Sequence, residues 1–179
     1  MNKIPAQLIE NFRRGDRRAA ASLFEQLRRP LFGYFYRLCS DRFVAEDLLQ
    51  ETLLTIHSRI ETFNSDFEFM PWAYAVARNK FFEFKRSQNR VVRLQIVSVS
   101  AVEEPGHEGF SAGSDLSLDV KKILEDLSEP IREAFILKHF QNLTFERVAE
   151  LQEVPLPTAK SRVLFALKKI REYLHRGEK

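Results

Sequence analysis

The chain has 179 residues, of which 44% are hydrophobic and 30% are charged, and its net charge at pH 7 is +3. This content suffices for one ordinary domain or two small ones, and with only 6 glycines it favours a helical protein. The single cysteine, Cys39, excludes an internal disulfide and a multi-cysteine metal site. Residues 1–18 lack the apolar segment of a signal peptide, and no run is long enough to span a bilayer, so we expect a cytoplasmic protein without membrane insertion.

Two helices are predicted at the start of the chain. A short one covers residues 8–12 and ends at Gly15–Asp16, and a long one covers residues 23–38, where apolar side chains recur every three or four positions. Pro30 lies inside the long pattern and predicts a kink or a local break there. A third helix is expected over residues 44–63, with its boundary at Ser40–Asp41.

Polar and acidic side chains project from the start of this third predicted helix, opposite its apolar stripe. Acidic residues in a first helical turn are stabilised by the helix dipole, so one interpretation is purely structural. The other interpretation is an acidic surface for a basic partner protein. The residues in question are Glu46, Asp47, Gln50 and Glu51.

A turn and an unusual helix follow. Residues 64–68, NSDFE, predict a turn because Asn, Ser and Asp side chains bond to nearby backbone, and Pro71 suits the first turn of a helix over residues 71–90. In that helix aromatic rings alternate with cations, which is typical of a surface that stacks unpaired bases and neutralises phosphates. The alternative is that the rings belong to the core. The rings are Trp72, Tyr74, Phe81, Phe82 and Phe84, and the cations include Arg78, Lys80, Lys85, Arg86 and Arg90.

The helical pattern disappears after residue 90. Residues 91–100 predict a short strand or an extended segment, and the acidic stretch with Pro and Gly that follows predicts a flexible linker ending near residue 117. From residue 118 onward four helices are expected. Ser128 is a candidate N-cap of the second of these helices, and Asn142 can take the left-handed conformation that ends it.

The last two helices form a helix-turn-helix pattern. Thr144 is the candidate N-cap of the first, a break covers residues 152–155, and the second has an inward stripe of Ala159, Val163, Ala166, Ile170 and Leu174. Its outward side is suited to a DNA major groove, although an ordinary helical hairpin with a basic face would share the pattern. That outward side includes Thr158, Lys160, Ser161, Arg162, Phe165 and Lys168.

No catalytic or cofactor motif accompanies these helices. The four histidines are scattered without metal-ligand spacing, and no glycine-rich phosphate loop is present. Asp66 and Glu68 could act as paired carboxylates, but acids next to each other in a loop are common. We therefore expect a protein that is not an enzyme and holds neither a cofactor nor a metal.

Three segments together resemble the extracytoplasmic-function (ECF) sigma factors of bacteria, here taken as part of the primary-type sigma family. They are AEDLLQET at residues 45–52, WAYAVARN at 72–79, and the long segment from LSEPIREAF to TAKSR at 127–162. The resemblance implies an all-α protein of two small domains. Residues 1–90 would be sigma domain 2, residues 91–117 the linker, and residues 118–179 a four-helix sigma domain 4 with the helix-turn-helix.

The resemblance also implies roles for residues. The acidic cluster would bind the clamp helices of the largest subunit of core RNA polymerase, and the polymerase flap would be a further contact. The turn would hold a base flipped out of the melted −10 strand, and the outward side of the last helix would read the duplex −35 element. The implied −10 residues are Asn64, Ser65, Asp66, Phe67, Arg78, Asn79, Lys80, Lys85, Arg86 and Arg90, and the implied −35 residues are Thr158, Lys160, Ser161, Arg162, Phe165 and Lys168.

Departures from the family pattern affect the −35 surface most. Pro157 stands where Gly is usual, Ala159 replaces Val, and Phe165 and Leu167 replace cations, so weaker phosphate binding is expected. Phe81 and Phe82 make the opening helix unusually apolar, which suits a protein interface. The resemblance predicts an inhibitory anti-sigma factor and, with polymerase, association with the nucleoid. The alternatives are a stand-alone helix-turn-helix regulator of transcription and a degenerate sigma-like protein that binds only other proteins.

Overall fold

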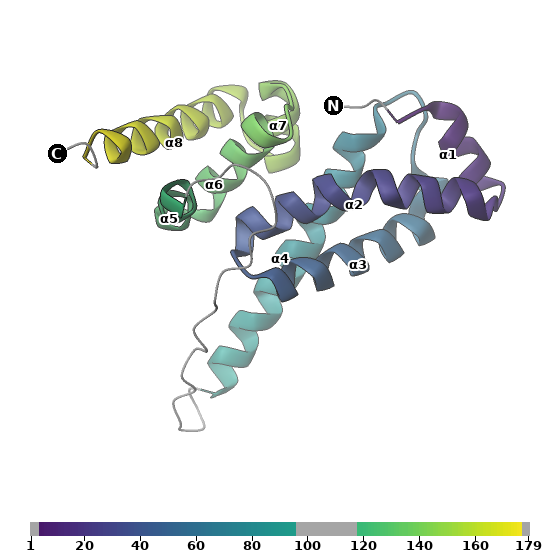
Figure 1. Cartoon of the computed structure of the whole chain (residues 1–179), viewed down its shortest axis with the longest axis horizontal. Helices are drawn as coiled ribbons and strands as arrows, with labels where there is room; N and C mark the ends of the chain where they lie inside the picture. Colours follow the sequence, from purple (N-terminus) through teal and green to yellow (C-terminus); the bar gives the residue numbers. More distant parts are fainter. Residues whose placement is uncertain (1–3, 96–117, 177–179) are drawn as a thin grey trace.

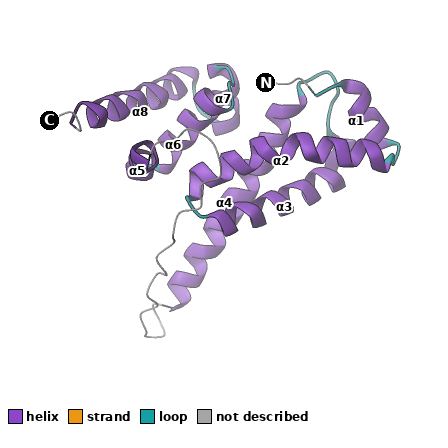
Figure 2. Cartoon of the chain, in the orientation of Figure 1, coloured by secondary structure: helices purple, strands orange, loops and turns teal. Residues whose placement is uncertain are grey.

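A computed structural model describes residues 4–95 and 118–176 (Figure 1). Most of the predicted linker lies outside the described residues. Within them the chain forms helices and loops but no strand, which confirms the all-α prediction (Figure 2). The elements are α1 Ala6–Arg13, α2 Arg17–Cys39, α3 Arg42–Arg59, the 3₁₀ turn η1 Ile60–Thr62, α4 Phe69–Gln95, α5 Leu118–Asp126, α6 Glu129–Phe135, the π-helical turn η2 Ile136–Phe140, α7 Phe145–Gln152 and α8 Leu156–Arg176.

Helices α1 to α4 pack as one helical unit around the apolar side of α2. Leu23, Leu27, Leu31 and Phe35 are fully buried along that side, as the sequence spacing predicts. Of the two effects predicted at Pro30, a kink or a local break, the break does not occur, since α2 runs through Pro30 to Cys39. Burial of the leucines on both sides of Pro30 outweighs the backbone hydrogen bond that proline cannot make.

Caps decide where α3 begins. Ser40 ends α2 in the left-handed conformation, with φ 57°. The Asp41 carboxylate then accepts hydrogen bonds from the backbone N–H of Phe43 and Val44, at 2.8 and 3.1 Å. The helix therefore starts at Arg42, earlier than the predicted residue 44, because an aspartate at the N-cap satisfies the first free backbone donors.

Helix α4 is longer than predicted. It runs from Phe69 to Gln95, so residues 91–95 are helical where the sequence indicated a strand or an extended segment. No glycine or proline interrupts the chain between Pro71 and Pro105. The β-branched Val91 and Val92 lower helix propensity only slightly, and they do not end a helix that is already formed.

Helices α5 to α8 form the second helical unit. Ser128 stands at the N-cap of α6 but makes no side-chain capping bond, and Asn142 takes the predicted left-handed conformation with φ 53°. The Thr144 hydroxyl accepts from the Arg147 N–H at 3.2 Å and caps α7 as expected. Gln152 is the buried last residue of α7 rather than part of the break, which covers residues 153–155.

The predicted stripe of α8 is correct over most of its length. Ala159, Val163 and Ala166 are buried and Ile170 is half-buried. Leu174 is exposed, so its assignment to the core is wrong. Figure 1 shows why, because the last turns of α8 extend beyond the other helices of the unit.

No helix in the described part of the chain is long and apolar enough to cross a membrane.

The two units pack against each other. Helix α2 contacts α6 and η2, and α4 contacts α7. One continuous cluster of buried apolar side chains includes Leu31 and Tyr74 from the first unit and Ile136 and Val148 from the second. The first helix of the helix-turn-helix, α7, therefore lies against α4 of the first unit in this arrangement.

Candidate nucleic-acid interface

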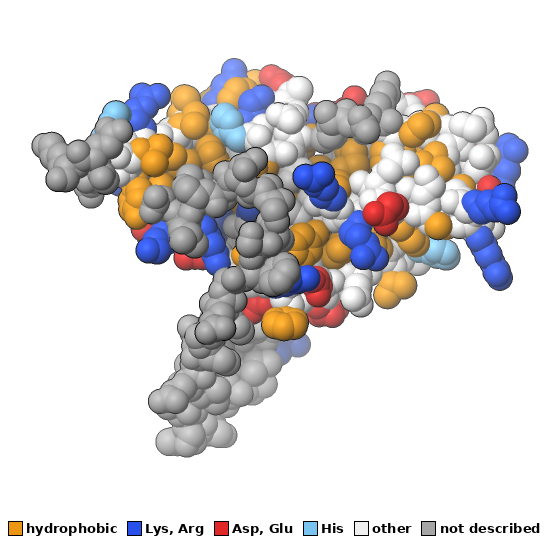
Figure 3. All heavy atoms as spheres, in the orientation of Figure 1, with side chains coloured by type: hydrophobic (Ala, Val, Ile, Leu, Met, Phe, Trp, Pro, Cys, Tyr) orange, Lys and Arg blue, Asp and Glu red, His pale blue; other side chains and the backbone are white. Residues whose placement is uncertain are grey.

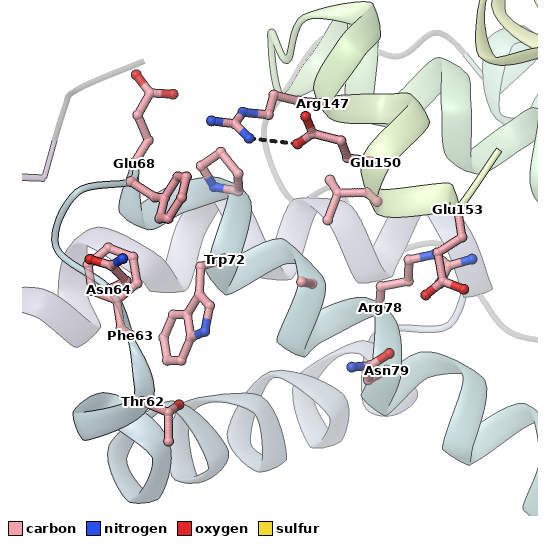
Figure 4. A pocket seen from close by; sticks show the side chains of 14 residues that line it. Thr62, Phe63, Asn64, Glu68, Trp72, Arg78, Asn79, Arg147, Glu150 and Glu153 are labelled. Carbon is pink, nitrogen blue, oxygen red and sulfur yellow. Dashed lines mark hydrogen bonds and ion pairs between the residues drawn. The ribbon is translucent and has the colours of Figure 1, made fainter. Parts of the chain in front are cut away.

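A pocket of about 410 Å³ lies beside the turn that the sequence singles out. Side chains of the first unit, including Asn64, Trp72 and Asn79, form one side of it. Arg147 and Glu150 of α7 close it from the other unit and pair with each other at 2.6 Å (Figure 4). We refer to this space as the loop pocket.

The turn is ordered by its own side chains. The Asn64 Oδ1 accepts from the Asp66 N–H at 2.9 Å, and the Phe67 N–H donates to the Asn64 carbonyl at 3.2 Å. Asn64 and Phe67 line the loop pocket, whereas Ser65 and Asp66 are exposed outside it. The structure thus brings together two of the four predicted turn residues.

An aromatic cluster packs beside the turn. The rings of Phe63, Phe69 and Trp72 lie with centroids 5.1 to 5.3 Å apart. Phe63 and Phe69 are buried, and Trp72 is half-buried with its ring on the pocket lining. Such contacts between rings fix the position of the pocket wall.

The prediction of a stacking surface along α4 is wrong for two of its rings. Tyr74 and Phe81 are buried in the core, and their spacing of seven residues puts them on one helical face. Phe82 is half-buried beneath the Arg78 guanidinium, which lies 4.6 Å from the ring centroid. Of the rings predicted to stack, Trp72 lines the loop pocket, together with Phe63 and the exposed Phe67.

The cations of α4 differ in what they contact. Arg78 lines the loop pocket, but its Nε lies 3.3 Å from Oε1 of the buried Glu133. Lys80 pairs with Glu83 at 3.0 Å, and Lys85 pairs with Glu129 of α6 at 3.4 Å. Arg86 and Arg90 are exposed. Arg78 and Lys85 therefore bind the second unit in this arrangement.

The acidic cluster lies on the solvent side of α3. Asp47, Gln50 and Glu51 are exposed, and Glu46 pairs with Arg42 at 2.8 Å. The interpretation as first-turn acids is wrong, since α3 has no acidic residue in its first turn. The helix dipole acts mainly within that turn, so it does not explain these residues.

Two exposed apolar residues on α3 were not recognised in the sequence. Phe43 is 75% exposed and Leu54 is 71% exposed. With Asp47 and Gln50 they follow the spacing of one helical face, which combines apolar ends with a polar centre. The signal was present in the sequence, because Phe43 and Leu54 fall outside the stripe that contains Leu49 and Ile56.

The outward side of α8 is largely accessible. Lys160, Ser161, Phe165 and Lys168 are exposed, and Thr158 is half-buried. Arg162 differs, because its Nη1 donates to Oε1 of Gln152 at 2.8 Å. Arg162 thus braces the two helices of the helix-turn-helix.

Basic side chains also gather at the end of the molecule formed by α1 and the start of α2 (Figure 3). Arg14, Arg17 and Arg18 are exposed there.

A buried polar network joins the two units around Glu133, which is 2% exposed. The Gln152 Nε2 donates to Oε2 of Glu133 at 2.8 Å, and the Tyr34 hydroxyl donates to Oε1 at 2.8 Å. The Tyr74 hydroxyl donates to Oε1 of Gln141. Burial raises the pKa of Tyr34, the Glu133 charge raises it further, and burial also raises the pKa of Tyr74.

Two family models match the chain in succession. Residues 23–91 match Sigma-70 region 2, and residues 117–170 match Sigma-70, region 4. The RNA polymerase sigma-H factor of Pseudomonas aeruginosa is 27% identical over 172 residues, which cover 89% of this chain and 88% of that protein. The ECF RNA polymerase sigma-E factor of Escherichia coli is 25% identical over 171 residues, with coverage of 89% and 88%.

Solved structures agree with these relatives. The sigma factor RpoE in complex with the anti-sigma factor NepR from Bartonella quintana has a TM-score of 0.70 and 29% identity, covering 81% of this chain and 89% of that chain. CnrH in complex with the cytosolic domain of CnrY has a TM-score of 0.70 at 18% identity, covering 96% and 97%, and shows the fold alone. None of these likenesses supports the primary-type label. The chain carries both sigma-70 regions in order and is similar to ECF sigma factors over 89% of its length, and it is therefore an ECF sigma factor of the sigma-70 family.

Proposed function

We propose that this sigma factor directs bacterial RNA polymerase to specific promoters by reading the −35 element and trapping the melted non-template strand of the −10 element. The observation that carries the proposal is the loop pocket, a space of about 410 Å³ whose first-unit wall holds Asn64, Phe67, Trp72 and Asn79 and whose other wall belongs to α7. A pocket with two amides and two rings suits one unpaired base, because amides bond to the base edge and rings stack on its face.

The free energies involved allow the melted strand to be trapped without ATP hydrolysis. Flipping a base out of a duplex costs a few kcal/mol, and stacking on an aromatic ring returns about 1–3 kcal/mol per base. Phosphate contacts from the exposed Arg86 and Arg90 would add a salt-dependent term. The chain therefore acts as a specificity subunit, and the polymerase supplies the chemistry and the remaining contacts.

The face of α3 is the proposed contact with the clamp helices of the polymerase. Asp47, Gln50 and Glu51 offer acceptors to a basic partner, and Phe43 and Leu54 offer apolar area at each end. Large apolar side chains that are exposed beside polar ones mark a protein interface. In the second unit, Lys160, Ser161 and Lys168 are the proposed contacts with the −35 duplex, with Phe165 beside them.

Promoter binding requires the two units to separate. The −10 and −35 elements are about 25 base pairs apart by their numbering, on the order of 85 Å at about 3.4 Å per base pair. Here α7 lines the same pocket as the −10 turn, and Glu133 pairs with Arg78. Separation would expose the loop pocket and release Arg78 for phosphate. The compact arrangement is thus the inactive one in this proposal.

An anti-sigma factor is the proposed inhibitor. The RpoE structure of Bartonella quintana contains the anti-sigma factor NepR, and that sigma factor shares 29% identity with this chain. A partner that stabilises one domain arrangement shifts the population toward it, by as much as its affinity for the two states differs.

Run-off transcription on genomic fragments with purified core polymerase tests the function. Transcripts from particular fragments that appear only when this chain is added would support it and would yield the promoter sequence. A chain that binds duplex DNA alone, without core polymerase, would instead favour the stand-alone helix-turn-helix regulator. A chain that binds core but yields no transcript from any fragment would favour the degenerate sigma-like protein.

A further inference from the structure

Arg13 of α1 holds the turn that forms the loop pocket. Its Nε and Nη2 each donate to the Ile60 carbonyl at 3.3 Å, Nη2 also donates to the Phe63 carbonyl, and Nη1 donates to the Ser65 hydroxyl at 3.0 Å. These bonds span 47 to 52 residues of sequence. One guanidinium thus connects three points of the segment that leads into and through the turn.

The contacts are chemically well matched. The carbonyls of Ile60 and Phe63 lie where α3 and η1 end, and free carbonyls at a helix end attract cations. The planar guanidinium holds N–H donors on three nitrogen atoms in a rigid fork, whereas all the donors of a lysine start from one nitrogen atom. Its carbon Cζ also lies 5.8 Å from the centroid of the Phe63 ring. The Arg13 side chain is only 18% exposed, so water competes weakly for these bonds.

Pairing with Glu10 does not explain this position. The closest approach of Arg13 to Glu10 is 3.9 Å, whereas the neighbouring Arg14 pairs with the same carboxylate at 3.1 Å. Arg14 is 71% exposed and serves as the ordinary partner of Glu10. Arg13 turns instead toward the carbonyls and the hydroxyl of the turn.

Helix α1 gives Arg13 a fixed base. Ile9 and Phe12 are buried, and the Phe12 ring packs edge-on against Phe24 at 5.6 Å and His57 at 5.3 Å. Side chains held by packing transmit position rather than absorb it. The matched region 2 segment begins at residue 23, so α1 and Arg13 lie outside it.

We propose that Arg13 is a positioning residue for the base pocket. It binds the backbone carbonyl of Phe63 before Asn64 and the side-chain hydroxyl of Ser65 after it, and so fixes where the Asn64 amide meets the trapped base. Arg13 does not touch the base itself. This proposal rests on the proposed function, because it assigns Arg13 a role in the trapping step of that function.

The experiment measures binding of single-stranded DNA by holoenzyme made from core polymerase and the full chain. The probe is the non-template −10 strand of the promoter recovered by run-off transcription, with an abasic site placed at each position in turn. We expect one position in the wild type to show an affinity loss of about tenfold, the size of one stacked and hydrogen-bonded base. In R13A and R13K that loss should fall to about twofold while the other positions change little.

The matched control is R14A, which removes the same charge from the same helix end without touching the turn and should reproduce the wild-type scan. R13K keeps the charge and the side-chain stem, so it decides the question if R13A does not fold. Variants that keep the full loss at the one position would overturn the role of Arg13 and leave the base pocket standing. An equal weakening at every position would mean a general structural role and would also overturn it. A flat scan in the wild type would remove the base pocket and Arg13's role with it.

Discussion

The Tyr34 hydroxyl donates a 2.8 Å hydrogen bond to Oε1 of Glu133 and thereby links α2 of the region 2 domain to α6 of the region 4 domain. Both side chains are buried. Glu133 also binds Gln152 of its own domain and Arg78 of the other, so one carboxylate connects the two domains. A buried charge of this kind is tolerated only while its partners remain in place.

Removing the tyrosine hydroxyls should favour the open arrangement. Y34F with Y74F deletes two donors across the domain interface and leaves buried acceptors on Glu133 and Gln141, at a cost of about 1–3 kcal/mol each. We expect a larger radius of gyration in small-angle scattering and stronger binding of single-stranded −10 DNA.

The matched control for this double variant is Y36F. The Tyr36 ring stacks on Phe32 at 5.9 Å, and the substitution retains that ring. Y36F should scatter like the wild type. An unchanged radius of gyration and unchanged DNA binding in the double variant would mean that these hydroxyls do not hold the domains together.

Stability should fall steeply at alkaline pH. Burial raises the pKa of Tyr34 and Tyr74 above their unfolded value of about 10. Above that pH the folded state retains protons that the unfolded state has lost, so the free energy of unfolding decreases as pH rises. Below about pH 10 both states are protonated and the contribution is constant. Urea unfolding from about pH 8 to about pH 11 should show the decrease, and Y34F with Y74F should show a shallower one. Equal slopes would contradict this origin.

The helices could be predicted from the sequence because their apolar residues repeat at helical spacing. The apolar residues at that spacing are buried between Leu23 and Leu38 and between Ala159 and Ala166. The turn at residues 64–67 could be predicted because an Asn side chain readily accepts a hydrogen bond from the backbone two residues on, as Asn64 does from the Asp66 N–H. The observed helix ends differ from the predicted ones where a capping bond sets the end. At Asp41 the carboxylate accepts from the Phe43 N–H, so α3 begins earlier than predicted. The predicted burial of Leu174 was wrong because periodicity shows which face of a helix is apolar but not whether another element covers that face.

The connections between distant segments could not be predicted. Glu133 reads as a surface residue of a short helix, yet it is buried because Tyr34, Gln152 and Arg78 converge on it from three other helices. Arg13 reads as one of many arginines, and only the fold brings it to Phe63 and Ser65. For Tyr74 and Phe81 the sequence leaves two interpretations, a nucleic-acid surface and the core, and the fold decides for the core because both rings are buried.

The apolar ends of the α3 face should contribute to core binding. F43A with L54A removes exposed side chains, so the free energy of unfolding should change by less than about 0.5 kcal/mol. Affinity for core polymerase should fall by about tenfold or more, because large apolar side chains carry much of the energy of an interface. Fluorescence anisotropy with labelled chain gives the affinity.

D47A with Q50A should abolish promoter-dependent transcription without unfolding the domain. L164A is the matched control for F43A with L54A, since Leu164 is also a large exposed apolar residue but lies on α8. If F43A with L54A binds core as the wild type does, the polymerase contact uses only the polar centre of the face. Normal transcription by D47A with Q50A would mean that the contact lies elsewhere.

Asn79 should matter more for strand opening than for duplex binding. It is exposed on α4 and lines the loop pocket, which is the proposed place of the unpaired base. N79A should lower permanganate reactivity of the −10 region by about tenfold, while affinity for the closed duplex stays within about twofold. N89A, on the same helix beyond the pocket, is the control and should open the promoter normally. Equal losses in opening and in duplex binding would argue against a base-trapping role.

The cations of α8 should separate into a DNA contact and a structural brace. Lys160 is exposed, so K160A should leave stability unchanged and reduce the slope of log affinity against log salt by about one, the effect of one phosphate contact. Arg162 bonds to Gln152, which bonds to Glu133, so R162A should destabilise the domain by about 1–3 kcal/mol. Thermal unfolding and salt titrations with −35 duplex DNA measure both, and K122A on α5 is the control for a lost surface charge. If K160A leaves the slope of log affinity against log salt unchanged, the phosphate contacts lie on another face. If R162A is as stable as the wild type, the bond to Gln152 is not needed to hold α7 against α8.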